Sequence, residues 1–511
     1  MGAAFHASAP MRILYLDLDS QRPDHLGCYG YHRETSPCID AIAAEGVRFT
    51  NCYAPDAPCL PSRTALYSGQ HGIHTGVINH GGAYAQPFVE GPDRAFQDRF
   101  RGSSFPGLLG AAGYYTACIS PFGNRHAAWH WMAGFNEMLD PGGKGGMESA
   151  DEVAPAVVDW IERNAGRENW FLHVNLWDAH TPYRAPAPFG NPFADEPLPA
   201  WYTEEVRQKH WGEPGPHSAQ EVNGFFLDEA YAANFAEDFP RQPHQIDSLE
   251  AARAMFDGYD CGVRYSDQIV GQFIDTLKAA GIWEDTVVII SADHGENLGE
   301  LNIYGDHQTA DAMTCRIPLI IRWPGLTDGA RAGTTQDGLL YNFDWAATVL
   351  EMLGAEVPAD WDGQSFAPTF QAGEDFGRPF LVSSQGAWSC QRGVRWGDYI
   401  LVRSYFDAYH GFPEVMLFDL KNDPHEQHDL APTHPELVHA GLAKLDHWWG
   451  HMMRTAAHPV DPMWAVVHEG GPYHARIDHR AYMARLRETG RARWADHFDA
   501  AYGPDGLKRR G

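Results

Sequence analysis

The stretch Cys59-Leu-Pro-Ser-Arg63, inside Asp56-Ala-Pro-Cys-Leu-Pro-Ser-Arg-Thr-Ala-Leu-Tyr-Ser-Gly69, combines a thiol, a rigid proline, a hydroxyl and a guanidinium within five residues. Proline and serine are typical of the first turn of a helix, so we expect Cys59 just before a helix N-terminus. The amide donors and partial positive charge of such a terminus favour an anion. Because Arg63 follows one helical turn later, it would point to the same side as Cys59 and face the same oxyanion.

The motif Cys59-x-Pro-Ser-Arg63, followed by Ala65-Leu-x-Ser-Gly69, resembles the signature of the type I sulfatases, a family within the alkaline phosphatase superfamily. The resemblance implies that a formylglycine-generating enzyme oxidises Cys59 to formylglycine during maturation. In that family the formylglycine hydrate is the nucleophile, and its second hydroxyl group expels sulfate. By themselves, the residues also fit an N-capping loop with a merely buried cysteine, as most free cysteines are.

Composition restricts the classes of partner. The chain has 511 residues, which is long for one ordinary domain, and 44% of them are hydrophobic, which suits a sizeable core. The formal charge of −29 argues against nucleic acid and anionic membrane surfaces as partners. The same charge repels anionic substrates at long range, so a small sulfate ester is easier to admit than a polysulfated glycan.

The cysteines and the N-terminus indicate a reducing compartment. The eight cysteines include no CxxC pair, and several lie in apolar runs, which is typical of reduced thiols. Residues 1–10 have neither the basic region nor the apolar core of a signal peptide, and no stretch approaches the length of a transmembrane helix. We therefore expect a cytoplasmic protein with no membrane partner.

Apolar runs alternate with amphipathic helical patterns along most of the chain. This alternation predicts an α/β fold with a large, mostly parallel sheet sandwiched by helices, and ligands outside the carboxyl ends of its strands. The predicted strands are 12–19, 47–53, 115–120, 170–177, 286–292 and 317–323. The predicted helices are 37–45, 105–112, 152–164, 248–280 and 343–353.

Three domain-level units are expected. Residues 1–377 form a catalytic domain of alkaline phosphatase or sulfatase type, in which the proline- and aromatic-rich part 181–247 is a lid-like insertion. Residues 378–450 form a smaller α+β domain with an antiparallel sheet, from strands 379–384, 393–405 and 414–420 and a helix 435–449. Residues 451–511 are a C-terminal extension, which packs either on its own chain or, as an arm, across the interface of a homo-oligomer.

The smaller domain also carries a family resemblance. Its segment Leu417-Phe-Asp-Leu-Lys-Asn-Asp-Pro-His-Glu-Gln-His-Asp-Leu430 is similar to a run found in sulfatase C-terminal domains.

Carboxylates follow two of the apolar strands. Asp19 ends the first one, in Leu16-Asp-Leu-Asp-Ser-Gln-Arg-Pro-Asp24, and Asp293-His294-Gly295 follows Val288-Ile-Ile-Ser-Ala292. Carboxylates at such places are costly to bury unless they are paired, hydrogen-bonded or bound to a metal. The resemblance implies that Asp19, Cys59, Asp293 and His294 hold one divalent cation.

The composition of this ligand set leaves two questions open. Calcium suits its oxygen atoms best, while the imidazole makes manganese the alternative. Ser20 stands where many members of the family have a second aspartate, and Asp17 lies deeper on the same strand, so either could complete the shell around the metal.

Further site residues are implied by position. His180, in His-x-Pro-Tyr, resembles the histidine that contacts the sulfate ester in the family, and His307 lies where related hydrolases place a lysine. Arg125 and His126 follow a strand where many sulfatases have Gly-Lys-Trp-His, although here the lysine is missing. His80 is a candidate for lining the pocket. We thus assign catalytic roles to Cys59, Arg63, His126, His180 and His307, and substrate binding to His80 and Arg125.

These residues predict a sulfuric ester hydrolase of arylsulfatase type that acts on a small sulfate ester. One alternative is a phosphonate monoester or phosphodiester hydrolase of the same superfamily, or a glycan sulfatase. The other is a non-catalytic binding protein on this fold. Retention of cysteine within the oxidation motif favours the sulfatase over a simple phosphatase, because serine or threonine could attack but could not release the product in the same way.

Overall fold

The computed structural model describes residues 11–88, 99–214, 217, 240–243, 245–503 and 506. A nine-stranded sheet runs through the main body in the order β11-β2-β10-β7-β1-β6-β4-β5, with β12 also paired to β2. Its central strands β7, β1, β6, β4 and β5 are parallel, while β10 is antiparallel to β7 and to β2. The strands are β1 (Arg12–Leu18), β2 (Val47–Tyr53), β4 (Tyr115–Ile119), β5 (Glu137–Leu139), β6 (Trp170–Leu176), β7 (Thr286–Ser291), β10 (Arg316–Arg322), β11 (Thr334–Gln336) and β12 (Leu340–Tyr341).

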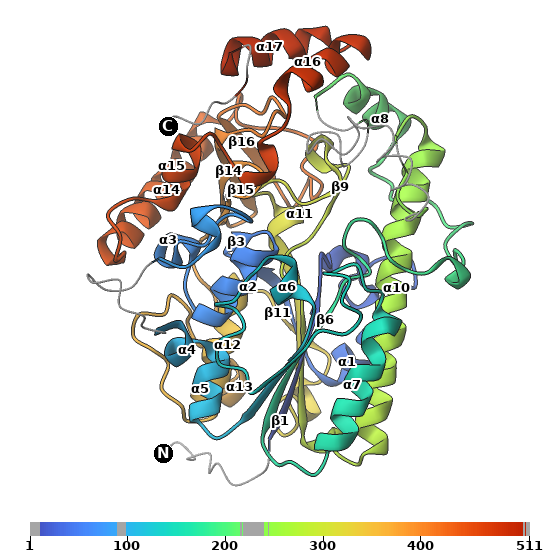
Figure 1. Ribbon diagram of the computed structural model, residues 1–511, viewed down its shortest axis with the longest axis vertical. Coiled ribbons are helices and arrows are strands. Elements are labelled where there is room, and N and C mark those ends of the chain that lie inside the picture. Colours follow the sequence, from blue (N-terminus) through green and yellow to red (C-terminus); the bar gives the residue numbers. More distant parts are fainter. Residues whose placement is uncertain are drawn as a thin grey trace.

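Helices cover both faces of this sheet, as Figure 1 shows. Ile39, Trp160 and Phe273 belong to a core on one face, and Phe105, Trp345 and Phe370 to a core on the other. The first face carries α1 (Pro37–Glu45), α7 (Ala150–Asn164) and the long α10 (Leu249–Ala279); the second carries α2 (Cys59–Ser68), α5 (Phe105–Ala111), α12 (Asn342–Met352) and α13 (Ala367–Ala372). The predicted α/β sandwich is therefore confirmed.

A second, smaller sheet meets the first near Cys59. Its order is β16-β15-β14-β13-β3, antiparallel except where β13 pairs with β3. Since β2 belongs to the large sheet and β3 to the small one, the chain crosses between the sheets immediately before α2. The strands are β3 (Asp56–Ala57), β13 (Leu381–Gln385), β14 (Cys390–Trp396), β15 (Tyr399–Phe406) and β16 (Val415–Asp419).

One predicted strand of the small sheet is wrong. The apolar run 393–405 forms two strands, β14 and β15, because Gly397 and Asp398 make a tight turn between the paired residues Trp396 and Tyr399. Gly397 has a φ of +48°, a left-handed conformation that glycine adopts without strain. The predicted helix 435–449 is also longer in the structure, as α14 (Pro435–Thr455).

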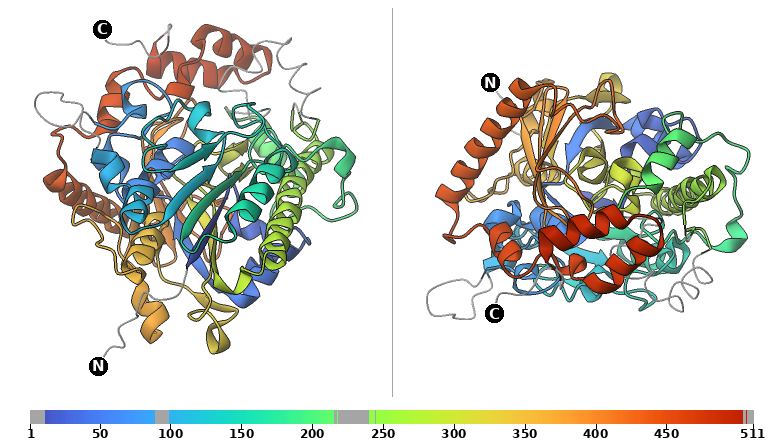
Figure 2. Two further views of the ribbon diagram at one scale, coloured as in Figure 1. Left: turned by 60° about the horizontal axis from the view of Figure 1, so that its bottom comes forward. Right: turned by 90° about the horizontal axis from the view of Figure 1, so that it is seen from above.

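The C-terminal extension packs on its own chain. It continues into α15 (Pro462–His468), α16 (His479–Glu488) and α17 (Ala492–Tyr502), which share a core with Ile78 and Tyr409. Figure 1 places α16 and α17 at the top end of the molecule, and in the right-hand view of Figure 2, seen from above, the C-terminal helices lie in front. The homo-oligomeric arm stays a prediction.

The expected insertion 181–247 is described only in part, because 215–216, 218–239 and 244 lie outside the described residues. Its described part includes α8 (Glu204–Trp211) and contacts two parts of the chain: Trp201 stacks on His425, which follows β16 of the small sheet, and the Tyr202 hydroxyl is 2.9 Å from that of Tyr304, which precedes β13. Among the residues that the structure describes, no helix combines the length and apolar composition needed to cross a membrane.

Candidate active site

Cys59 is the first residue of α2 and is completely buried, with Pro58 as the N-cap residue. Its Sγ atom lies 3.1 Å from Nε2 of His294. Burial raises the pKa of the Cys59 thiol well above its ordinary value, and the Asp19 and Asp293 carboxylates add to the shift while Arg63 opposes it. At neutral pH this thiol is protonated, so unmodified Cys59 is a poor nucleophile.

Arg63, one turn further along α2, binds three carboxylates at once. Its Nε donates to Asp17 Oδ2 at 2.7 Å, Nη1 to Asp293 Oδ2 at 2.7 Å and Nη2 to Asp19 Oδ2 at 2.9 Å. All four side chains are at most 1% exposed. Phe122 and Trp177 cover the guanidinium, whose Cζ lies 4.5 and 5.4 Å from their ring centroids.

The charges of this cluster fit a divalent cation. Three buried carboxylates share one guanidinium, and an excess of buried negative charge is costly unless a cation balances it. Burial raises the pKa of Asp293 to about 7, with Arg63 opposing and Asp19 adding to the shift. Ligand atoms of Asp19, Cys59, Asp293 and His294 all lie within 4.8 Å of one another. The four predicted metal ligands therefore meet at one place.

His294 is oriented as a metal-binding imidazole would be. Its Nδ1 is 2.8 Å from the carbonyl oxygen of Gly295, so Nδ1 carries the proton and Nε2 presents a lone pair. That Nε2 faces Asp293 Oδ2 at 3.2 Å and Asp19 Oδ1 at 3.9 Å.

The two residues left open for the metal shell have other partners here. Asp17 Oδ2 accepts from Arg63 and lies 3.1 Å from His173 Nε2, whose ring also contacts the Tyr67 hydroxyl. The Ser20 hydroxyl donates to Asp19 Oδ1 at 3.1 Å, and its amide to Asp293 Oδ1 at 3.3 Å. Sequence reasoning missed His173, although a histidine within the apolar run Trp170–Leu176 signals a buried polar partner.

Four further predicted residues surround Cys59 in two pairs. Nitrogen atoms of His180 and His307 lie within 4.8 Å of its Sγ and of each other, and so do nitrogen atoms of His80 and His126. The amide of Leu60 donates to His80 Nε2 at 3.5 Å. Burial lowers the pKa of all four imidazoles well below the ordinary value, and nearby positive groups add to the shift.

Arg125 lies at the edge of this group. Its guanidinium stands over the Trp177 ring, 5.1 Å from the centroid, and Nη1 is 3.5 and 3.4 Å from the carbonyl oxygens of Gly145 and Gly146.

Sequence reasoning also missed three neighbours of the predicted residues. Glu296 Oε2 is 3.1 Å from His307 Nδ1, and His474 Nε2 is 2.9 Å from His80 Nδ1. Trp388 stacks on His474 with ring centroids 4.3 Å apart. His474 lies in the C-terminal extension. The chain has 27 histidines, and no motif around His474 marks it as a site residue.

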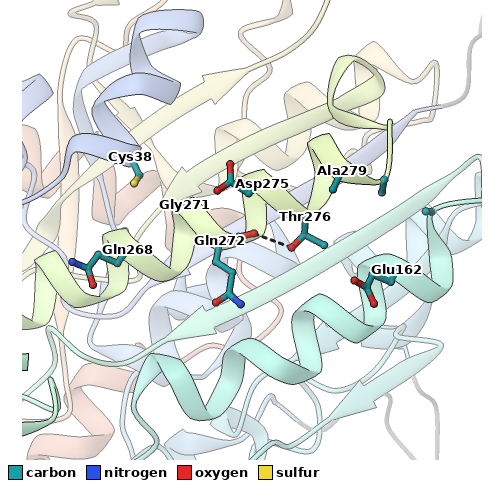
Figure 3. Close-up of a pocket in the computed structure, with 10 residues that line it drawn as sticks. Cys38, Glu162, Gln268, Gly271, Gln272, Asp275, Thr276 and Ala279 are labelled. Atoms are coloured by element: carbon teal, nitrogen blue, oxygen red, sulfur yellow. Dashed lines mark hydrogen bonds between the residues drawn. The ribbon is translucent and has the colours of Figure 1, made fainter. Parts of the chain in front are cut away.

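A separate surface groove between α7 and α10 contains none of these residues. Figure 3 shows its lining, which includes Cys38, Glu162 and Asp275.

Comparisons with known proteins agree with this geometry. The family model described as sulfatase matches residues 12–355, and that of the C-terminal part of N-sulphoglucosamine sulphohydrolase matches 299–444. The chain is 25% identical over 487 residues to an N-acetylglucosamine-6-O-sulfatase of Bacteroides thetaiotaomicron, covering 82% of each protein.

Two solved structures share the fold. BT4656 in complex with D-glucosamine-2-N,6-O-disulfate has a TM-score of 0.68 at 20% identity, with 87% of this chain and 98% of that one covered. The phosphonate monoester hydrolase SpPMH from Silicibacter pomeroyi has a TM-score of 0.66 at 22% identity, with 88% and 96% covered. Since the sulfatase model spans well over half of the chain, the protein belongs to the sulfatase family of sulfuric ester hydrolases.

Proposed function

We propose that the protein hydrolyses small sulfate monoesters, of arylsulfatase type, with residue 59 as the nucleophile. The observation that carries the proposal is the position of Cys59: it starts α2 inside the oxidation motif, and its Sγ belongs to the same 4.8 Å cluster as Asp19, Asp293 and His294.

The roles follow from what each side chain faces. Arg63 would hold Asp19 and Asp293 in place and offset the charge that shifts during transfer. His180 and His307 are candidates for delivering a proton to the leaving oxygen, since both lie beside residue 59. On the opposite side, His126, His80 and Arg125 would contact the ester.

Two groups, a divalent cation and an aldehyde at position 59, would complete the chemistry. Asp19, Asp293, His294 and residue 59 would hold a divalent cation, calcium or alternatively manganese, which polarises sulfate oxygens when bound. A formylglycine-generating enzyme would supply the aldehyde at position 59, whose hydrate provides a hydroxyl nucleophile. The cytoplasmic location stays a prediction from the sequence.

The experiment combines peptide mass spectrometry with active-site titration. We expect formylglycine in the peptide that carries residue 59, and activity proportional to its fraction across preparations. Cys118, equally buried in β4, is the matched control and should remain cysteine. Cys59→Ser should transfer at most one sulfate per site, and Cys59→Ala none. Native turnover by fully unmodified protein would refute the proposal.

The second candidate is a phosphonate monoester or phosphodiester hydrolase. It is favoured by the imidazole of His294 in the metal cluster and by Ser20 in place of the second aspartate. Parallel kinetics on 4-nitrophenyl sulfate and a 4-nitrophenyl phosphonate separate the two. A higher kcat/KM for the phosphonate would replace the sulfatase assignment.

A further inference from the structure

A closed circuit of aromatic rings surrounds Cys59, and we call it the aromatic collar. Neighbouring ring centroids around the circuit are 4.3 to 6.4 Å apart. One half runs through Trp177, His180, His307 and Trp388. The other half returns through His474, His80, His126 and Phe122 to Trp177.

The collar encloses the reacting position. Cys59 Sγ lies within 4.8 Å of nitrogen atoms of His180 and His307 in one half, and of His80 and His126 in the other. A sulfate ester bound at residue 59 would therefore lie next to these rings.

Three collar nitrogens are buried without a partner in the protein. Considering only the described part of the chain, these are the indole nitrogens of Trp177 and Trp388 and Nε2 of His126. Trp177 and Trp388 are 0% and 6% exposed. Indole nitrogens in the core, such as those of Trp131 and Trp345, share this state, so the unpaired atoms are compatible with a bound ligand but do not by themselves identify one.

The extension closes the circuit through His474. The amide of Tyr473 donates to Asn79 Oδ1 at 3.1 Å, and that of His474 to the Ala387 carbonyl at 3.1 Å. The Tyr473 ring packs so closely on Gly81 that a Cβ atom there would lie 2.3 Å from it. His474 lies beyond both matching family models, which end at residues 355 and 444.

His474 also fixes the orientation of His80. Because the Leu60 amide donates to His80 Nε2, the His80 proton sits on Nδ1 and is donated to His474 Nε2 at 2.9 Å. Burial, with Arg125 adding, lowers the pKa of His474 to about 3, so this imidazole is neutral at pH 7.

We propose that the aromatic collar binds the organic group of the ester, that His474 completes it as a positioning residue for His80, and that it favours an aryl group over a sugar. The proposal rests on the function proposed above. Flat rings gain from contacts with aromatic faces, whereas a saturated sugar ring has no aromatic face of its own to stack on them.

The test compares 4-nitrophenyl sulfate with glucosamine 6-sulfate for each variant relative to wild type, so that intrinsic ester reactivity cancels. His474→Ala removes the contacts with His80 and Trp388, and we expect its kcat/KM to fall about tenfold for the aryl ester and less than about threefold for the sugar. His474→Gln can accept from His80 Nδ1 but cannot stack, so kcat should recover while KM stays raised. His497→Ala, an exposed histidine of α17, is the control and should change neither.

A second measurement does not depend on turnover. Calorimetric binding of 4-nitrophenol should weaken at least about fivefold in His474→Ala and in Trp388→Ala, and persist in Cys59→Ala. The wild type could lack sulfatase activity and still bind 4-nitrophenol more tightly than His474→Ala does. That result would support the collar and overturn only the proposed function. Equal rate losses for both esters in folded His474→Ala, with unchanged nitrophenol binding, would overturn the collar.

Discussion

Arg63 Nη1 lies 2.7 Å from Asp293 Oδ2, and this ion pair joins the second turn of α2 to the end of β7. The two residues are 230 positions apart in the sequence. A second bond runs parallel to it, since Ser62 Oγ donates to the Asp293 carbonyl at 2.6 Å. The nucleophile-bearing helix is therefore held against the strand end that supplies Asp293 and His294.

Arg63→Lys should destabilise the protein and abolish activity. The guanidinium reaches Asp17, Asp19 and Asp293 through three different nitrogens, which a single ammonium cannot reproduce. Leaving a buried carboxylate without its partner should lower the free energy of unfolding by about 3 kcal/mol. Urea unfolding and turnover of 4-nitrophenyl sulfate measure the two effects. Arg163→Lys, on the solvent face of α7, is the control, and an equal change in both variants would contradict the assignment.

Asp293→Ala should lose both bound metal and turnover. The substitution removes one of the clustered carboxylates and leaves only Asp19, residue 59 and His294 as donors. Elemental analysis after dialysis against a chelator, followed by re-addition of Ca²⁺ or Mn²⁺, measures the first effect, and ester turnover the second. Asp285→Ala, whose side chain is 61% exposed, should match wild type. Full activity of dialysed Asp293→Ala would remove this residue from the metal site.

The sequence could predict the large sheet because its strands are local apolar runs. The 47–53 strand and the 37–45 helix are observed with the predicted bounds. The cluster of Asp19, Cys59, Asp293 and His294 was predictable for a related reason: Asp19 and Asp293 follow parallel strands that end at the same edge of the sheet.

The remaining features depend on contacts that no local pattern encodes. His474 reaches His80 from 394 positions away, through a loop held by backbone bonds to Asn79 and Ala387. The hairpin between Trp396 and Tyr399 is a different case, because Gly397-Asp398 is a local turn signal that the prediction of a single strand 393–405 overlooked.

His180→Ala should slow esters of poor leaving groups more than activated aryl esters. His180 lies beside residue 59, and a proton donor matters most when the leaving oxygen is basic. The dependence of log kcat/KM on the pKa of the leaving phenol should become steeper in the variant. His428→Ala, whose side chain is 81% exposed, is the control. A uniform loss across the series would assign His180 to substrate positioning instead.

Asp178, two residues before His180, is a buried carboxyl group whose pKa is higher than its ordinary value. Burial raises its pKa from 3.8 to about 7, although the Ala150 amide, Arg184 and Ser266 oppose the shift. Between these two values the folded state keeps a proton that the unfolded state has lost. The contribution of Asp178 to stability is therefore most favourable below pH 4, becomes less favourable as the pH rises towards 7, and is constant above it.

Asp178→Asn should remove this pH dependence. Asparagine keeps the neutral shape, can accept from the Ala150 amide and can donate to Ser266 Oγ. At about 1.4 kcal/mol for each pKa unit, the variant should gain up to roughly 4 kcal/mol over wild type by pH 8, and much less at pH 5. Urea unfolding of both proteins at pH 5, 6, 7 and 8 gives the difference in free energy. Asp159→Asn, on the exposed side of α7, should show no such trend. A difference for Asp178→Asn that stays constant from pH 5 to 8 would mean that Asp178 is ionised throughout, and that its bonds to Ala150 and Ser266 stabilise the carboxylate.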